Sequence, residues 1–442
     1  MENTRAIVLE VLTEAEKDQA SYGRILSGVL DKYNYLDRRD KAFIKLLAEG
    51  TVDRRITLDF ILDKKSSVKT HKMKPVIRNI LRMGVYQIIF TDSPAYAVVK
   101  ESVALAGKRG FKGLGGFVNG VLRNIAAQAA AAGNSAEERL SVFLPARGEM
   151  SDEKYFSIRY SLPEFISEHF ISELGDRAES VMSSMSGIRG VTFRFSLKLS
   201  PEEVAEAVGR IEAAGVQMDA EDGEPRIYHA FRTGDIRSLP GYDEGLFNVQ
   251  DLSSYKAVLS AGITKGDKVL DLCAAPGGKT VLASELAGDE GSVTSCDISD
   301  YKADLITENI TRMNCRNVRV LVRDATVPVP EDEDKYDVVI MDVPCSGLGV
   351  IGKKRDIKYN LTPEGMESLC ELQKKIADAG VRYVRKGGIL MYSTCTIRRA
   401  ENEDRVRYIT ENYPFTIVKG PVQLLPDEAT QDGFFYTILR KA

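Results

Sequence analysis

The chain has 442 residues, of which 43% are hydrophobic and 28% are charged, and its formal net charge is −4. This composition is typical of soluble globular domains, and no apolar run approaches the roughly 20 residues that cross a membrane, so an integral membrane protein is excluded. The length is too great for one hydrophobic core, and we expect roughly two to four domains.

Cysteine and histidine usage bears on metals and on the cellular compartment. The chain has three histidines, and its six cysteines form no Cys-x-x-Cys pair, so we expect no metal site. The sequence starts without a signal-peptide pattern, and a disulfide framework is not expected in a chain of this kind. We therefore predict that the protein works in reducing cytoplasm.

Charge is distributed unevenly along the chain. Residues 1–135 contain 22 Lys and Arg against 14 Asp and Glu, a net charge of +8, and the remainder carries −12. A basic module on an acidic body suggests a polyanionic partner. A helical domain that is merely soluble would show the same excess, so the charge alone leaves both interpretations open.

Residues 1–130 are predicted to be helical throughout. Apolar residues recur at helical spacing, as in the stripe of Ile7, Val8, Val11 and Leu12. Cations interrupt these stripes, and a cluster of them in one domain is a weak signal of nucleic-acid binding. Arg38 and Arg39 are the candidate RNA contacts here.

Four short motifs in this region resemble those of the NusB-type RNA-binding domain. They are residues 36–43 (LDRRDKAF), 50–52 (GTV), 81–87 (LRMGVYQ) and 116–123 (GFVNGVLR). The resemblance covers about 130 residues, and it implies a helical bundle that binds RNA.

Residues 131–240 are predicted to hold a linker and a small α+β module. An alanine-rich run ends in Gly133, Asn134 and Ser135, which is typical of a helix end followed by a linker. We expect helices over 164–186 and 201–214, and strands at 191–195, where apolar residues alternate, and near 226–231.

From about residue 241 to the end, strands and helices alternate. We predict strands at 268–272, 292–296, 317–322, 336–341, 388–393 and 434–439, with helices near 279–287, 300–313, 363–385 and 399–412. Alternation of this kind predicts a doubly wound, mostly parallel, Rossmann-like sheet, which binds ligands beyond the carboxyl ends of its strands. One marked residue follows each of the first five strands: Cys273, Asp297, Asp324, Asp342 and Cys395.

The first of these strands runs into a glycine-rich turn, residues 271–280 (DLCAAPGGKT), which precedes a helix. Glycines let the backbone approach a ligand, and the start of a helix offers free N–H groups. The spacing is neither G-x-G-x-x-G nor that of a phosphate loop, which favours a nucleoside with a carboxylate such as S-adenosylmethionine. Asp297 follows at the distance expected of a ribose ligand, and Asp324 is placed to meet the adenine edge. The alternative for each aspartate is a helix cap.

Two cysteines are predicted to lie at one edge of the sheet. Cys345 lies in residues 342–347 (DVPCSG), and Cys395 lies in residues 393–396 (STCT). A lone cysteine at a strand end is most often a small buried hydrophobic residue, but a pair beside a nucleoside site suggests chemistry. Carbon 5 of cytosine becomes nucleophilic when a thiolate adds at carbon 6, and a carboxyl group such as Asp342 could share a proton with cytosine N3.

With these residues in view, the chain from about residue 150 to residue 442 resembles the NOL/NOP/Sun family of RNA cytosine-5 methyltransferases. The matching motifs are the glycine turn, both cysteine motifs, residues 247–251 (FNVQD) and residues 323–325 (RDA). The resemblance implies that Cys395 attacks the base and that Cys345 assists release of the product. It also implies that S-adenosylmethionine lies against Cys273, Ala274, Ala275, Pro276, Gly277, Gly278, Lys279, Asp297, Asp324 and Asp342.

Together the motifs predict a multidomain enzyme that methylates carbon 5 of a cytosine in 16S ribosomal RNA. The basic residues Lys353, Lys354 and Arg355 are expected to meet RNA phosphates beside the site, and we expect a monomer. A transfer RNA cytosine-5 methyltransferase is an alternative within the same class. An RNA-binding protein without catalysis is an alternative of another class, which the intact cysteines and glycine turn disfavour.

Overall fold

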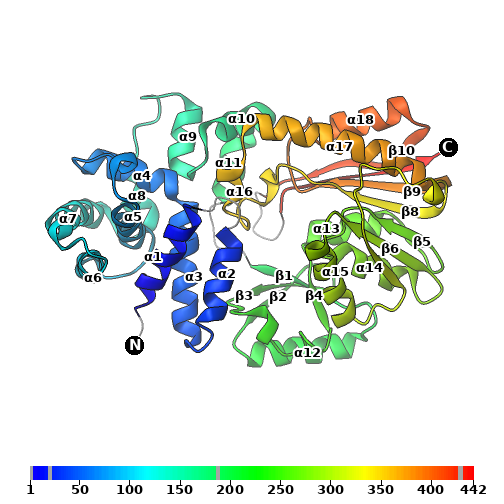
Figure 1. Cartoon of the computed structure of the whole chain (residues 1–442), viewed down its shortest axis with the longest axis horizontal. Coiled ribbons are helices and arrows are strands. Elements are labelled where there is room, and N and C mark those ends of the chain that lie inside the picture. Colours follow the sequence, from blue (N-terminus) through cyan, green and yellow to red (C-terminus); the bar gives the residue numbers. More distant parts are fainter. Residues whose placement is uncertain (1–2, 18–21, 186–189, 427–431) are drawn as a thin grey trace. The chain divides into compact units, whose positions relative to one another are not determined.

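A computed structural model describes residues 3–17, 22–185, 190–426 and 432–442 (Figure 1). The chain forms two compact units. The first comprises residues 1–186 together with 354–360, and the second comprises residues 187–353 together with 361–442. Across the described ranges, no helix is both long enough and apolar enough to span a membrane.

The first unit is helical, as the sequence predicts. Its main helices are α1 (Thr4–Ala15), α2 (Tyr22–Lys32), α3 (Arg38–Asp53), α4 (Arg55–Lys65), α5 (Pro75–Phe90), α6 (Ala95–Lys108), α7 (Gly115–Ala132), α8 (Ala136–Ser141), α9 (Asp152–Tyr160), α10 (Glu164–Leu174) and α11 (Ala178–Ser184). One core joins α1 to α8 and contains the apolar stripes of the sequence, including Val8, Leu58, Leu81 and Ile125. The NusB-like bundle is therefore confirmed as a fold.

Two glycines of the NusB-like motifs allow close helix contacts. A Cβ atom on Gly50 of α3 would lie 1.9 Å from the ring of Tyr86 on α5, and a Cβ atom on Gly84 would lie 2.8 Å from Leu122 on α7. Side chains cannot approach so closely, so these positions need glycine for packing.

A short segment of the later chain belongs to the first unit. It contains α16 (Ile357–Asn360), and the ammonium group of Lys358 lies 2.9 Å from Oδ1 and 2.8 Å from the main-chain oxygen of Asp53. Burial alone would raise the pKa of Asp53, but Lys358, Arg54 and Arg355 together outweigh it and lower the pKa. Lys358 is therefore a structural cation.

The second unit begins with a small four-stranded antiparallel sheet in the order β2-β3-β1-β4. Its elements are β1 (Val191–Phe195), α12 (Pro201–Ala213), β2 (Gln217–Ala220), β3 (Ile227–Phe231) and β4 (Phe247–Val249). Phe193, Phe195 and Phe247 pack with Val204 and Ile211 of α12, so the predicted alternation buries one face of this sheet.

The rest of the second unit is a seven-stranded sheet in the order β10-β11-β9-β8-β5-β6-β7. Its elements are α13 (Leu252–Ser260), β5 (Lys268–Asp271), α14 (Gly278–Ala287), β6 (Ser292–Asp297), α15 (Asp300–Arg312), β7 (Val318–Val322), β8 (Tyr336–Asp342), α17 (Pro363–Tyr383), β9 (Val384–Thr394), α18 (Glu403–Asn412), β10 (Phe415–Leu424) and β11 (Phe434–Lys441). Strands β5 to β9 pair in parallel, and β10 and β11 add an antiparallel edge. The predicted Rossmann-like sheet is confirmed.

Successive residues of its strands face opposite layers of helices. Leu270 packs toward Ile376 of α17 and Ile409 of α18, whereas Val269 packs toward Val258 of α13 and Leu282 of α14. Figure 1 shows α17 and α18 on one face, with α13, α14 and α15 on the other. Both faces are covered, so ligands reach this sheet at its edges.

Several elements differ from the sequence predictions, among them β2 and β4, which were not predicted. The single helix expected over 164–186 divides at Gly175, whose φ of 52° is incompatible with a continuous right-handed helix. Strand β10 was not predicted, because Gly420-Pro421 and irregular pairing near Lys419 interrupt its alternation.

Candidate active site

The carboxyl edge of the seven-stranded sheet brings together the residues that the sequence marks. Asp297 and Asp342 are the last residues of β6 and β8, and Cys273, Asp324 and Cys395 follow β5, β7 and β9 by one or two residues. Because these five strands are parallel, all five residues lie at the same edge. The predicted gathering is confirmed.

The glycine turn and Asp297 form one hydrogen-bonded unit. The main-chain N–H of Ala275 donates to Asp297 Oδ2 at 3.0 Å, and the N–H of Ile298 donates to Oδ1 at 2.8 Å. Gly277 adopts a φ of 104°, which favours glycine, and α14 begins at Gly278. Asp297 is thus a fixed carboxylate at the strand end, and Lys302 lies 2.9 Å from it.

The two other groups expected at a nucleoside site differ in exposure. Asp324 is exposed, and hydrogen bonds from Thr326 lower its pKa. Cys273 is half-buried, and desolvation, followed by the nearby carboxylates Asp297, Asp271 and Asp342, raises the pKa of its thiol. The thiol of Cys273 therefore favours its neutral form.

Asp342 joins the glycine turn to β9. Its Oδ2 lies 2.6 Å from the ammonium group of Lys279, and its Oδ1 accepts a hydrogen bond from Ser393 Oγ at 2.8 Å. Burial lowers the pKa of Lys279, but Asp342 outweighs it, and Asp271 and Cys395 raise the pKa further. Lys279 therefore stays protonated and acts electrostatically on the Cys395 sulfur.

The two cysteines are in contact. The Sγ atoms of Cys345 and Cys395 are 3.1 Å apart, and the main-chain N–H of Cys395 donates to Cys345 Sγ at 3.3 Å. The contact with Cys395 is the largest cause that raises the pKa of Cys345, followed by burial and by the charges of Glu401 and Asp342. The thiol of Cys345 therefore favours its protonated form while the Cys395 sulfur lies beside it.

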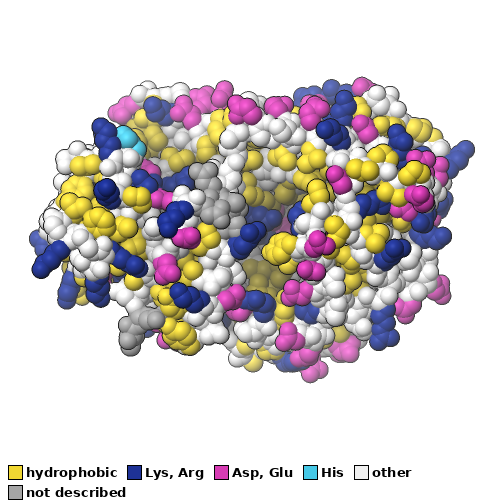
Figure 2. Space-filling view, in the orientation of Figure 1, with side chains coloured by type: hydrophobic (Ala, Val, Ile, Leu, Met, Phe, Trp, Pro, Cys, Tyr) yellow, Lys and Arg dark blue, Asp and Glu magenta, His cyan; other side chains and the backbone are white. Residues whose placement is uncertain are grey.

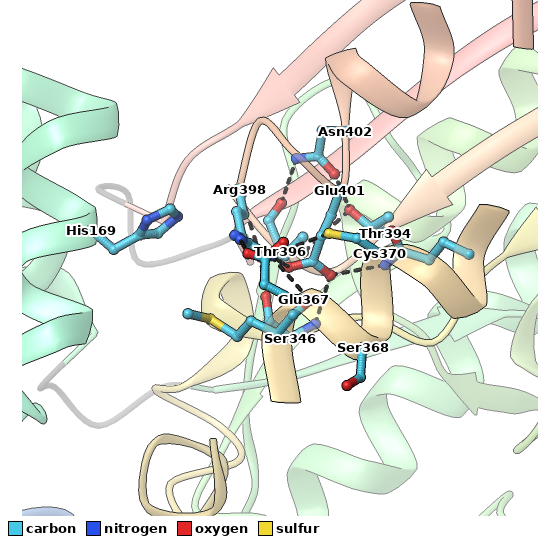
Figure 3. Close-up of polar contacts among 12 residues, drawn as sticks. His169, Ser346, Glu367, Ser368, Cys370, Thr394, Thr396, Arg398, Glu401 and Asn402 are labelled. Carbon is cyan, nitrogen blue, oxygen red and sulfur yellow. Dashed lines mark hydrogen bonds and ion pairs between the residues drawn. The ribbon is translucent and has the colours of Figure 1, made fainter. Parts of the chain in front are cut away.

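Behind the cysteines lies a buried polar network that the sequence did not indicate (Figure 3). Glu401 is completely buried, and its Oε2 accepts hydrogen bonds from the Ser346 N–H and from Gln373 Nε2, each at 2.9 Å. A glutamate six residues after Cys395 in a polar stretch is normally solvated, so no spacing rule marks it. Only its position just beyond the Thr-Cys motif could have drawn attention to it.

The predicted RNA-binding cations lie in different environments. Arg38 and Arg39 are exposed on the first turn of α3 in the first unit. In the second unit the ammonium group of Lys353 lies 2.7 Å from Asp251 and 2.9 Å from Asp432. Its charge is therefore already paired within the protein.

The other two residues of that basic loop belong to the first unit. Lys354 is exposed, and Arg355 lies 4.0 Å from Asp53. The RNA contacts of all five cations stay predictions.

Comparison with known proteins agrees with this geometry. Residues 259–440 match a family model described as 16S rRNA methyltransferase RsmB/F, and residues 2–127 match the NusB family. The probable ribosomal RNA small subunit methyltransferase B of Bacillus subtilis is 30% identical over 461 aligned positions, which cover 99% of each chain. The chain belongs to the ribosomal RNA small subunit methyltransferase B family.

Other relatives extend this assignment. The probable family member of Synechocystis is 29% identical and covers all of both chains. A methyltransferase homolog protein from Pyrococcus horikoshii, 24% identical, superposes with a TM-score of 0.58 and covers 66% of this chain and 100% of its own. That likeness shows that the two chains share a fold.

The polar groups at the edge fit the bound methyl donor of such a family. A carboxylate at the end of β6 can accept hydrogen bonds from the two ribose hydroxyl groups, and the turn at Gly277 brings the backbone close to α15, where a Cβ atom would lie 3.3 Å from Ile306. No group of three or more metal-ligating side chains occurs in the ranges that the structure describes.

Proposed function

We propose that the protein methylates carbon 5 of one cytosine in 16S ribosomal RNA through a covalent bond between Cys395 and carbon 6. The observation that carries this proposal is the contact of two cysteine sulfurs, 3.1 Å apart, beside Asp342 at the carboxyl edge of a methyltransferase sheet. Carbon 5 is a poor nucleophile until a thiolate has added at carbon 6, so a cysteine at this place has a chemical purpose.

S-adenosylmethionine, when bound, supplies an electrophilic methyl group. We assign its binding to Cys273–Lys279, Asp297, Asp324 and Asp342. Asp297 is held by two main-chain N–H groups and keeps its acceptor oxygens at the end of β6. Asp324 is exposed at the end of β7, where an adenine amino group could donate to it.

Cys395 is the proposed nucleophile because a cation and a hydrogen-bond donor both interact with its sulfur. The Lys279 ammonium attracts its charge, and Cys345 can donate an S–H hydrogen bond to it. Asp342, which lies at the same edge, is proposed to share a proton with cytosine N3 while the thiolate adds to carbon 6.

Cys345 is proposed to act after methyl transfer. The largest cause of its raised pKa is Cys395, and this influence disappears once the Cys395 sulfur is bonded to carbon 6. Cys345 then loses its proton to solvent more easily, and it can help to remove the proton from carbon 5. The bond between carbon 6 and sulfur breaks as that proton leaves, which restores the cytosine ring and frees Cys395.

The proposed substrate is RNA because a basic helical unit accompanies the catalytic unit. Figure 2 shows Lys and Arg side chains over α6 and α7 of that unit. The exposed cations of these helices and the turn between them are Lys100, Lys108, Arg109, Lys112 and Arg123. Phosphates attract such a surface regardless of sequence.

Bisulfite sequencing of ribosomal and transfer RNA from a deletion strain tests the proposal. We expect one 16S cytosine to lose its 5-methyl mark and to regain it when the gene is restored. Loss of a mark in transfer RNA alone, or no loss in either RNA, would contradict the proposed substrate.

A further inference from the structure

Three of the four residues that flank the two cysteines hydrogen-bond to one short segment, Glu401–Asn402 (Figure 3). For Cys345, the following residue Ser346 donates its N–H to Glu401, and the preceding Pro344 accepts a hydrogen bond from Gln373 at 2.9 Å. Gln373 also donates to Glu401, so the carboxylate fixes both sides of the Cys345 loop.

The Cys395 loop is tied to the same segment. Asn402 accepts from Thr394 Oγ1 at 2.5 Å and donates to the Thr396 main-chain oxygen at 3.1 Å. The hydroxyl groups of Ser346 and Thr396 lie 2.7 Å apart and join the two loops directly. The positions of the two sulfurs relative to each other therefore depend on this network.

A hydrogen-bond acceptor alone would not require a charge at position 401. Among the described residues, Glu401 Oε1 accepts no hydrogen bond, and the nearest cation, Arg398, lies 3.9 Å from it. A glutamine would accept both hydrogen bonds through its amide oxygen without the cost of burying a carboxylate. The hydrogen bonds alone therefore do not explain why position 401 carries a negative charge.

We propose that Glu401 is a positioning residue for the methyltransferase reaction, and that its carboxylate holds the Cys345 loop against the loop that carries Cys395. Its negative charge also favours the thiol form of Cys345, together with the nearby charges of Cys395 and Asp342, while Lys279 faces Cys395 and Asp342. The charge of Glu401 thereby favours Cys345 as the hydrogen-bond donor of the contact between the two sulfurs. This role rests on the proposed function, but its effect on the thiols is measurable without RNA.

Three variants separate the charge from the hydrogen bonds. Glu401→Gln keeps both acceptor contacts and removes the charge, and Glu401→Ala removes both. Glu411→Gln removes an exposed carboxylate at the end of α18 and serves as the matched control. The full chain is used, and thermal unfolding verifies that each variant is folded.

The first readout is alkylation of each cysteine by iodoacetamide at about pH 8, followed by mass spectrometry, without RNA or methyl donor. Removing a nearby negative charge lowers the pKa of a thiol, and thiolates are the form that reacts. We expect the ratio of Cys345 to Cys395 alkylation to rise at least about threefold in Glu401→Gln and to stay unchanged in Glu411→Gln. An unchanged ratio in folded Glu401→Gln would overturn the charge effect.

The second readout is RNA that stays attached to the protein after denaturation. With its loop released, Cys345 should fail to assist product release, so Glu401→Ala should trap RNA as Cys345→Ala does. It should lower kcat at least about tenfold, with the KM for RNA and methyl donor nearly unchanged. Folded Glu401→Ala that turns over normally without trapped RNA would overturn the positioning role. If Cys345→Ala also traps no RNA, the proposed mechanism fails, while the alkylation ratio still decides the role of Glu401.

Discussion

The carboxyl edge of the seven-stranded sheet and the basic surface of the helical unit both carry predicted functional residues, but they are organised differently. At the sheet edge, Asp297, Asp342 and Cys395 are each placed by the end of a strand and then fixed by a neighbour. On the helical unit, Arg38 and Arg39 lie exposed on a helix turn. A site for chemistry needs fixed side chains, whereas a surface that binds phosphates needs only accessible charge.

The loop 353–358 shows why charge alone does not identify such a surface. Lys353 pairs with Asp251 and Asp432 in the second unit, and Lys358 is buried against Asp53 in the first. Both cations are paired with carboxylates of their own unit, so a run of basic residues in the sequence does not by itself show that their charges are available to phosphates. Variants at the two kinds of position should therefore fail in different ways.

Of the predicted effects of substitution, the largest is expected at Asp342. In Asp342→Asn, an amide faces the Lys279 ammonium and no carboxyl group remains to share a proton with the base. We expect methyl incorporation to fall by about 100-fold or more. Asp337→Asn, at the opposite end of β8, is the control and should keep most of the activity. An equal loss in both variants would mean that the sheet has been destabilised and that Asp342 has no special role.

A smaller effect is expected at Asp297. In Asp297→Ala, two ribose hydroxyl groups lose their acceptor, which costs about 1–3 kcal/mol of binding. Calorimetry with S-adenosylmethionine should show a loss of about tenfold or more in affinity. A folded variant with unchanged affinity would remove Asp297 from the cofactor site.

For substitutions on the helical unit, we expect the affinity for RNA to change severalfold. The double variant Arg38→Ser, Arg39→Ser should weaken binding to 16S ribosomal RNA and flatten its dependence on salt, because fewer counterions are released. Affinity for S-adenosylmethionine should not change. Filter binding at several salt concentrations measures the slope.

Lys353→Ser is the contrasting variant for that experiment. It leaves Asp251 and Asp432 without their shared cation, so it should lower the melting temperature with little change in the salt slope. If the salt dependence of RNA binding became flatter in Lys353→Ser alone, the RNA would contact the loop 353–358 and not α3.

The smallest effect concerns Asp271, a fully buried carboxyl group that accepts from Thr280 at 2.8 Å. Burial raises its pKa to about 7, whereas the unfolded chain has an ordinary value near 4. The folded protein therefore holds this proton more tightly, and the stabilisation present below about pH 4 is lost as the pH rises through about 7. Asn at this position cannot titrate.

Melting temperatures at about pH 5 and about pH 7.5 measure this difference. Between the two pH values, the protein should lose more thermal stability than Asp271→Asn loses, by a few degrees. Parallel changes in both proteins would show that Asp271 does not carry a shifted pKa.

Most of the sheet edge was predictable from the sequence because two local rules suffice. Alternation of strands and helices gives the parallel order, and parallel strands end at one edge, so Cys273, Asp297, Asp324, Asp342 and Cys395 follow without any knowledge of packing.

The supporting residues were not predictable in this way. The roles of three supporting residues depend on partners that are distant in sequence: Glu401, Gln373 and Lys358. Asp53, for example, is 305 residues away from its partner Lys358. Each resembles a solvated charge or amide in its own segment. Their burial depends on tertiary packing, which the local periodicity of the sequence does not indicate.

The most direct test of the central claim compares covalent RNA adducts in the two cysteine variants. Cys395→Ala should abolish methylation and form no denaturation-resistant RNA band, because the attacking sulfur is absent. Cys345→Ala should retain RNA through Cys395, and the double variant should show no band. A band from Cys395→Ala with none from Cys345→Ala would contradict the account and would place the nucleophile at Cys345. Normal methylation in both single variants, without any band, would show that the cysteines are only packing residues.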